Sequence, residues 1–156
     1  MDQPVGERSD EAEIAGDLAI ERATAVDLPA IIDVDRSVIG DARRQDYLAR
    51  HLAVGQCVVA RRGPAVVGFA VADTSFYEHG FLGLLIVHPH HRRRGIGSAL
   101  IGFVEKHCPT VRLFTSTNLS NATMHQFCRS LGYQPSGYVD NLDPGDPEII
   151  YSKRLR

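Results

Sequence analysis

Apolar positions along the chain follow two spacings, which predict helices and strands. Intervals of three and four residues predict amphipathic helices over residues 24–35, 41–54, 95–107 and 121–131. Short alternating or continuous apolar runs predict strands over residues 18–23, 56–62, 65–72, 81–87, 111–115, 133–141 and 149–153. The order β-α-α-β-β-β-α-β-α-β-β predicts an α/β fold of the α+β kind, with a central mixed sheet flanked by helices.

Glycine, proline and capping residues mark the boundaries of these elements. Thr24 and Asp27 resemble a capping box at the start of the first helix. Gly63-Pro64 predicts a hairpin between two β-rich runs. Gly68 weakens the second of these runs, unless another part of the backbone comes close to it. The run Phe81–Val87 is continuous and apolar, as a buried central strand should be.

Composition and charge narrow the functional classes. Residues 1–16 are acidic and aperiodic, so we expect a flexible tail followed by a single domain over residues 17–156. A net charge of -2 gives no global basic field, so we expect no nucleic-acid partner. No apolar run is long enough to span a bilayer, and the acidic N-terminus is unlike a signal peptide, so no membrane is expected. Three cysteines without a CxxC pair favour a reducing, cytoplasmic location.

The segment Val87–Leu100 combines features of an anion site. Gly95 and Gly97, between a buried strand and a helix, let backbone N–H groups approach an anion without interference from a Cβ atom. The cations of the run Arg92–Arg94 lie at the positive end of the helix dipole. This placement is unfavourable by roughly 0.3–1 kcal/mol for each cation. A polyanion such as coenzyme A, with its pyrophosphate and 3′-phosphate, would remove this conflict. The alternative is a solvated basic turn.

Two other glycine-rich motifs do not fit this segment. A Walker loop requires Gly-Lys-Ser/Thr, whereas Gly97 is followed directly by Ser98. A dinucleotide fingerprint requires a third glycine at the position of Leu100. Neither a Walker ATPase nor a dinucleotide-binding protein is therefore expected.

Val87–Leu100 resembles motif A of the GNAT superfamily of N-acetyltransferases, whose core is Arg/Gln-x-x-Gly-x-Gly/Ala. Arg92, Gly95 and Gly97 occupy its three fixed positions. Asn121–Tyr133 resembles the second motif of that family, and the two motifs have the correct order and separation. The resemblance implies a GNAT-like acyl-CoA N-acyltransferase fold. It also implies an enzyme that transfers an acetyl group from acetyl-CoA to a primary amine of a small molecule or peptide.

The resemblance further implies how acetyl-CoA would be held. Arg92 would contribute to cofactor binding, and the pyrophosphate would be held by the backbone amides of Arg93, Arg94, Gly95, Ile96, Gly97 and Ser98. The pantetheine arm would pair, like an added strand, with the backbone of Leu85, Ile86 and Val87. Asn121 would hydrogen-bond the cofactor, and it can cap the following helix at the same time.

Acetyl transfer also needs a proton for the departing thiolate and a donor for the oxyanion. In many relatives a tyrosine seven residues after the asparagine supplies the proton, and here that position holds Cys128. A thiol is a weaker hydrogen-bond donor than a phenol, and Cys128 is alternatively a small buried hydrophobe. Tyr133 and Tyr138 are nearby alternatives. A strand amide near Val87 is the oxyanion donor that the resemblance implies.

The amine must lose a proton before it attacks, so a general base is also needed. Some relatives have a glutamate five residues before the asparagine, where this chain has Ser116. Glu78 and His79, just before the central strand, are candidate bases, with two exposed loop residues as the alternative.

Three further expectations concern metals, catalysis and partners. His88, His90 and His91 lack a nearby carboxylate or cysteine, so we expect surface residues and no metal. The missing tyrosine and glutamate leave a catalytically weak CoA-binding module or sensor as the alternative function. The oligomeric state stays open, including a homodimer. A cationic acceptor is favoured by acidic residues in the predicted pocket loops, namely Asp41, Glu78, Asp140, Asp143 and Asp146.

Overall fold

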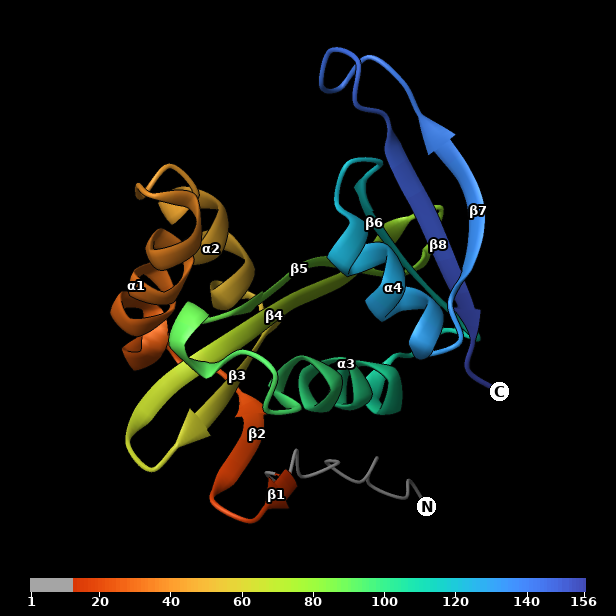
Figure 1. The fold of residues 1–156 in the computed structure, drawn as a ribbon. Coiled ribbons are helices and arrows are strands. Elements are labelled where there is room, and N and C mark those ends of the chain that lie inside the picture. Colours follow the sequence, from red (N-terminus) through yellow and green to blue (C-terminus); the bar gives the residue numbers. More distant parts are fainter. Residues whose placement is uncertain (1–12) are drawn as a thin grey trace, which may run out of the picture.

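A computed structural model describes residues 13–156 of the chain (Figure 1). The strands are β1 Glu13–Ala15, β2 Leu18–Arg22, β3 Cys57–Arg62, β4 Ala65–Phe76, β5 His79–Val87, β6 Arg112–Asn118, β7 Gln134–Val139 and β8 Glu148–Arg154. The helices are α1 Leu28–Ile39, α2 Gln45–Ala53, α3 Ile96–His107 and α4 Ala122–Ser130, with 3-10 turns at Ala25–Asp27 and Pro89–His91. Within this described part of the chain, no helix is long and apolar enough to cross a membrane.

All the strands belong to one mixed sheet, in the order β1-β2-β3-β4-β5-β6-β8-β7. Neighbouring strands are antiparallel except for β5 and β6, which are parallel. One face of the sheet packs against α1 and α2, and the other packs against α3 and α4 (Figure 1). The predicted α/β fold, with a mixed sheet between helices, is confirmed.

The tail predicted over residues 1–16 differs from the structure where the structure describes it. Glu13–Ala15 form β1, which pairs with β2 at the edge of the sheet. The sheet therefore begins before residue 17. The sequence did not indicate β1, because a strand of three residues is too short to show a recognisable alternation. Residues 1–12 of the predicted tail lie outside the described residues.

The hairpin between β4 and β5 is tighter than the polar loop expected between residues 73 and 80. β4 continues to Phe76, and β5 starts at His79, which pairs with Phe76. Only Tyr77 and Glu78 make the turn, both with positive φ (51° and 63°). The Phe76 ring stacks on Phe81, with 5.2 Å between ring centroids, and this contact extends the two strands beyond the apolar run.

The close backbone approach that was the alternative explanation for Gly68 is present. A Cβ atom at this position would lie 3.0 Å from the Ile86 carbonyl oxygen and 3.2 Å from the Ile96 side chain. The missing side chain therefore lets α3 settle onto β4 beside β5. Gly68 is part of what holds the start of α3 against the end of β5.

A half-buried ion network ties the start of α1 to the sheet. Asp27 is 5% exposed and accepts hydrogen bonds from Arg61 at 2.8 Å and from the Thr24 backbone N–H at 2.8 Å. The hydrogen bond from the Thr24 backbone N–H to the Asp27 carboxylate is one of the two that define the predicted capping box. Arg61 also donates to Glu21 on the neighbouring strand. Among residues 13–156, Arg61 is the cation that compensates the charge of Asp27.

We expect Arg61→Ala to lower the free energy of unfolding by about 3 kcal/mol, because it leaves the buried Asp27 carboxylate without its cation. Arg62→Ala is a matched control on the same strand, since its partner Asp17 has a side chain that is 73% exposed. Its loss should be below about 1 kcal/mol. Urea unfolding followed by circular dichroism measures both values, and equal losses would contradict the ranking.

Candidate active site

The central strand β5 separates from β6 part way along its length. The two strands pair only from Gly80 with Leu113 to Leu82 with Thr115. Thr115 donates its hydroxyl proton to the Leu82 carbonyl oxygen at 2.9 Å, at the last of these pairs. Beyond that point β5 still pairs with β4, but β6 turns away (Figure 1). We call the wedge between the diverging strands the β5–β6 gap.

Backbone groups of β5 point into this gap at alternate residues. His88 donates its N–H to Val67 of β4 at 2.9 Å, so residues in phase with His88 face β4. Ile86 is in phase with His88, and its backbone is already paired with β4. Leu85 and Val87 are out of phase and direct their N–H and C=O groups toward the gap. Of the three residues expected to pair with pantetheine, Leu85 and Val87 are suitably oriented and Ile86 is not.

A β-bulge lies at the narrow end of the gap. Val71 pairs with Leu84 and Ala72 pairs with Leu82, so Gly83 has no partner on β4. A Cβ atom at Gly83 would lie 2.9 Å from the Tyr47 hydroxyl oxygen of α2. Only glycine allows this hydroxyl to approach the backbone of β5 so closely.

Tyr47 brings a protonated hydroxyl to this end of the gap. Burial, followed by the negative charge of Asp73, raises the pKa of Tyr47 above its usual value. The phenol therefore stays neutral near pH 7 and can act as a hydrogen-bond donor or acceptor. The sequence showed Tyr47 only as part of an apolar helix face. The one available signal was a glycine inside the apolar strand that it contacts.

The wide end of the gap leads to the predicted anion loop. The chain passes through the turn Pro89–His91, then through Arg93 and Gly95 with φ of 61° and 77°, and enters α3 at Ile96. The α3 N-terminus has no side-chain cap, and its first helical bond runs from Ala99 N–H to the Gly95 carbonyl. The amides of the first turn are therefore available to an anion.

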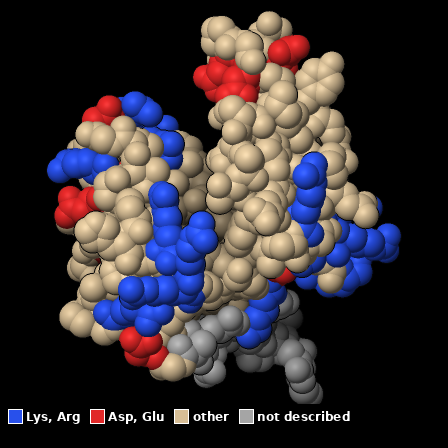
Figure 2. Space-filling view, in the orientation of Figure 1, with Lys and Arg blue, Asp and Glu red and all other residues tan. Residues whose placement is uncertain are grey.

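Arg92, Arg93 and Arg94 are exposed around these amides. Figure 2 shows Lys and Arg side chains gathered where Figure 1 places the loop between β5 and α3. No ion pair joins these three arginines to an acidic residue within residues 13–156. These cations lie uncompensated at the positive end of a helix, and the backbone of Arg93 is in the left-handed conformation. An anionic ligand would stabilise this arrangement.

Asn121 lies at the start of α4, across the gap from the loop's helix. Its side-chain oxygen accepts a hydrogen bond from the Met124 backbone N–H at 3.1 Å, so the predicted N-cap is confirmed. The amide nitrogen of the same side chain is not used by the cap, and its predicted contact with the cofactor stays a prediction. Phe127 of α4 packs beside Gly97 and brings α4 against the start of α3.

The candidate catalytic residues lie in three different places. Cys128 is 0% exposed within the core beneath α4, where burial raises its pKa to about 11. Glu78 is at the exposed tip of the β4–β5 hairpin, and His79 follows it with its ring 5.8 Å from that of Phe114. His79 is about 13 Å along the strand from Gly83, at roughly 3.3 Å per residue. The structure therefore does not bring these three residues together.

The other aromatic and histidine candidates have structural roles or exposed positions. Tyr133 is buried and donates its hydroxyl to Glu105 at 2.9 Å, whereas Tyr138 is exposed on the edge strand β7. The predicted surface histidines form ring contacts with one another, at 5.1 Å and 5.8 Å from His88 to His90 and His91. His88 also accepts a hydrogen bond from the His90 backbone N–H.

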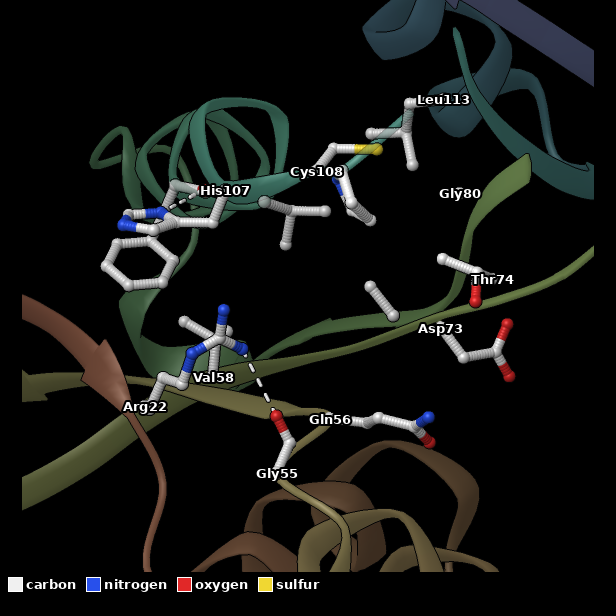
Figure 3. Close-up of a pocket in the computed structure, with 14 residues that line it drawn as sticks. Arg22, Gly55, Gln56, Val58, Asp73, Thr74, Gly80, His107, Cys108 and Leu113 are labelled. Carbon is white, nitrogen blue, oxygen red and sulfur yellow. Dashed lines mark hydrogen bonds between the residues drawn. The ribbon is translucent and has the colours of Figure 1, made fainter. Parts of the chain in front are cut away.

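A separate cavity of about 180 Å³ lies at the C-terminal end of α3 (Figure 3). Its polar lining includes Arg22, Asp73 and His107, and Arg22 donates to the Gly55 carbonyl at 3.1 Å. It is lined by no residue of the Arg92–Gly97 loop. This cavity is therefore distinct from the anion loop and from the wide end of the gap.

Comparison with known proteins identifies the family. Residues 27–133 match the family described as "Acetyltransferase (GNAT) family". A GNAT-family acetyltransferase from Bacillus cereus ATCC 10987 is 39% identical, with a TM-score of 0.85 over 89% of this chain and 98% of that one. The chain belongs to the GNAT acetyltransferase family, as the two motifs predicted.

Two further proteins are similar to this chain, one in structure and one over a short stretch of sequence. Arabidopsis thaliana Naa50, solved with the bisubstrate analogue CoA-Ac-MVNAL, is 17% identical with a TM-score of 0.71, over 88% of this chain and 98% of that one. A mycothiol acetyltransferase from Parafrankia sp. (strain EAN1pec) is 50% identical over 44 residues. That match covers 28% of this chain and 13% of the relative.

We expect Gly97→Leu to weaken acetyl-CoA binding at least about tenfold, or about 1.4 kcal/mol, because its side chain would cover the first-turn amides. A Cβ there meets Phe127 at 3.5 Å, an ordinary contact, and the melting temperature of the unliganded variant verifies that the larger side chain leaves the domain folded. Gly102→Leu in the same helix is the control, because a Cβ there has no neighbour within 4 Å. Isothermal titration calorimetry measures the affinities, and an unchanged affinity of the Gly97 variant would count against the anion loop.

For Cys128→Ala we expect a stability loss of about 1 kcal/mol and an unchanged turnover number, because the thiol is enclosed in the core. Cys57→Ala is a matched control, since Cys57 is also 0% exposed, with its pKa also raised to about 11 by burial. Thermal melts and steady-state rates of the two variants are compared. A rate loss confined to the Cys128 variant would instead identify its thiol as the proton donor.

Proposed function

We propose that this protein is an N-acetyltransferase that moves the acetyl group of acetyl-CoA to a primary amine of a small molecule or peptide. The observation that carries the proposal is the continuity of the β5–β6 gap with the anion loop. A strand edge with free backbone groups leads directly to an uncapped helix N-terminus surrounded by arginines. An elongated ligand with an amide-containing arm and phosphates at one end matches both parts.

The types and positions of the residues around the gap support coenzyme A as the ligand. Leu85 and Val87 would pair with the pantetheine amides in the manner of an added strand. The amides of Gly97 and its neighbours in the first turn of α3 would hold the pyrophosphate, and Arg92–Arg94 would compensate the phosphate charge. Acetyl-CoA supplies an activated acyl group when bound in this way.

This orientation directs the thioester toward the narrow end of the gap. With the phosphates at α3 and the arm along Val87 and Leu85, the acetyl group would lie beside Gly83. The Leu85 N–H points into the gap and is suited to stabilise the oxyanion as it develops. The Tyr47 hydroxyl lies against Gly83 and offers a second polar group there.

The acceptor would reach this point from the opposite side of the sheet to α3. Figure 2 shows a hollow between the side formed by α1 and α2 and the side formed by β7 and β8. Acidic residues lie around the β7–β8 loop at its rim, with no cation paired to Asp143 or Asp146 in the described chain. This charge distribution supports a cationic amine as the acceptor. The cytoplasmic location and the oligomeric state stay predictions.

The alternative is a CoA-binding module or sensor without turnover. It is favoured by Cys128 and Ser116, which stand at positions where many relatives have a tyrosine and some have a glutamate. Both functions predict saturable acetyl-CoA binding, so binding alone does not separate them.

A thiol-release assay with acetyl-CoA and a panel of amino acids, polyamines, aminoglycosides and peptides separates the two functions. We expect release of coenzyme A to depend on one class of amine and to be absent without an amine. The variant with Arg92, Arg93 and Arg94 all changed to Gln should show a raised KM for acetyl-CoA, most strongly at low salt. Saturable binding with no turnover for any amine would favour the sensor instead.

A further inference from the structure

A serine and a glutamate from neighbouring strands meet at the narrow end of the β5–β6 gap. The last parallel pair is Leu82 with Thr115, so Gly83 and Ser116 are the first residues on either side of the gap. Thr115 is buried, and alternation along β6 places Ser116 on the opposite face, the same face as Phe114. Gly83 is in contact with Tyr47 on that face. Ser116 therefore faces the place where the thioester and the amine would meet.

The Ser116 hydroxyl is oriented by Glu148, the first residue of β8. Ser116 Oγ donates its proton to Glu148 Oε1 at 2.8 Å. With this proton engaged, the oxygen lone pairs of Ser116 are left to accept a hydrogen bond from a donor in the gap. An alkylammonium group is such a donor.

The backbone at Glu148 is held in place, but the carboxylate of Glu148 has no ion-pair partner among residues 13–156. The preceding loop is tied to the end of β6, because Pro147 accepts the Leu119 N–H at 2.8 Å and Asp146 accepts the Ser120 N–H at 2.9 Å. Glu148 itself is half-buried, and its carboxylate forms no ion pair with any residue in the range 13–156. A fixed carboxylate without a counter-ion, bonded to a hydroxyl that faces the gap, is able to receive a proton.

We propose that Ser116 and Glu148 form a proton relay that deprotonates the amine acceptor; this inference rests on the proposed acetyltransferase function. The ammonium group gives one proton to Ser116 Oγ while the Ser116 hydroxyl proton passes to Glu148, which becomes a carboxylic acid. The neutral nitrogen then forms the C–N bond with the acetyl carbon, and the C–S bond breaks. The departing thiolate takes up the second proton that the nitrogen loses, and Glu148 returns its proton to solvent.

The relay explains how the site works with a serine where some relatives have a glutamate. Ser116 is too weak a base to act alone, and the carboxylate comes instead from β8, the neighbouring strand. Other titratable groups around Glu148 are Asp143 and Asp146 of the β7–β8 loop, Tyr138 of β7, and His125 of α4, whose Nε2 lies 3.0 Å from the carbonyl oxygen of Asn118, the β6 partner of Glu148. The two aspartates accept hydrogen bonds from Asn118 and Ser120, which lie beyond Ser116.

The first test compares Glu148→Gln and Ser116→Ala with the wild type in the thiol-release assay. Glutamine keeps an acceptor for the serine hydroxyl but cannot take up a proton at neutral pH. Both variants should lose about 10²-fold or more in turnover number at pH 7, while the KM for acetyl-CoA stays unchanged. Asp33→Asn on the exposed surface of α1 is the matched carboxylate-to-amide control. Circular dichroism and the acetyl-CoA-induced rise in melting temperature verify that each variant is folded.

The pH profile distinguishes a relay from a structural contact. Without the carboxylate, the enzyme can use only amine that is already neutral, and for an alkylamine acceptor with a pKa near 10 that fraction rises about tenfold per pH unit below the pKa. The deficit of Glu148→Gln should therefore shrink by about tenfold per unit between pH 7 and 9. A deficit that is constant with pH would overturn the relay and leave a structural role.

A charge-relocation variant completes the test. Ser116→Glu combined with Glu148→Gln places the carboxylate directly on β6 and should recover at least tenfold of the lost rate. If the wild type turns over and Glu148→Gln is equally active, the relay is overturned and the proposed function stands. The same conclusion follows if turnover is abolished by Glu78→Gln and not by Glu148→Gln. Wild-type protein that acetylates no amine overturns the proposed function and the relay together.

Discussion

The architecture of the site depends on one incomplete strand pairing. β5 is bonded to β4 along most of its length, whereas its bonds to β6 stop at Leu82, where the Thr115 hydroxyl closes the last pair. Backbone N–H and C=O groups inside a protein need partners, so the free edge at Leu85 and Val87 calls for water or a ligand. The consequence is a break in the hydrogen bonding in the middle of the sheet, and the site proposed above is built around this break.

The two ends of this gap have opposite electrostatic character. The wide end meets the uncapped start of α3 and the exposed run Arg92–Arg94, which together favour phosphates. The narrow end has Ser116 bonded to the unpaired carboxylate of Glu148, and it has Tyr47, whose pKa is raised by burial and then by the negative charge of Asp73. In the proposed site, a molecule with an anionic tail would be oriented along the gap in one direction. A cationic amine is attracted to the opposite end, where the thioester would be.

Elements whose formation depends on local sequence were predictable, and features that arise from tertiary contacts were not. Periodicity and capping identified the helices and the longer strands, and the glycine at position 68 correctly indicated a close backbone approach. The extension of β4 to Phe76 depends on ring stacking with Phe81, which comes from the partner strand. The bulge at Gly83 depends on the register between β4 and β5, which no single run of residues reveals.

The same distinction explains why the sequence predicted the anion loop but did not indicate the hydrogen bond between Ser116 and Glu148. The loop is contiguous in sequence, because a strand end, a turn and a helix start supply all its parts. Tyr47, Ser116 and Glu148 come from three elements that lie far apart along the chain, and only the order β5-β6-β8 brings two of them together. A serine at a position where a carboxylate is expected looks like a lost function when it is considered alone. Once the neighbouring strand is known, the same serine becomes the contact through which a carboxylate on β8 reaches the gap.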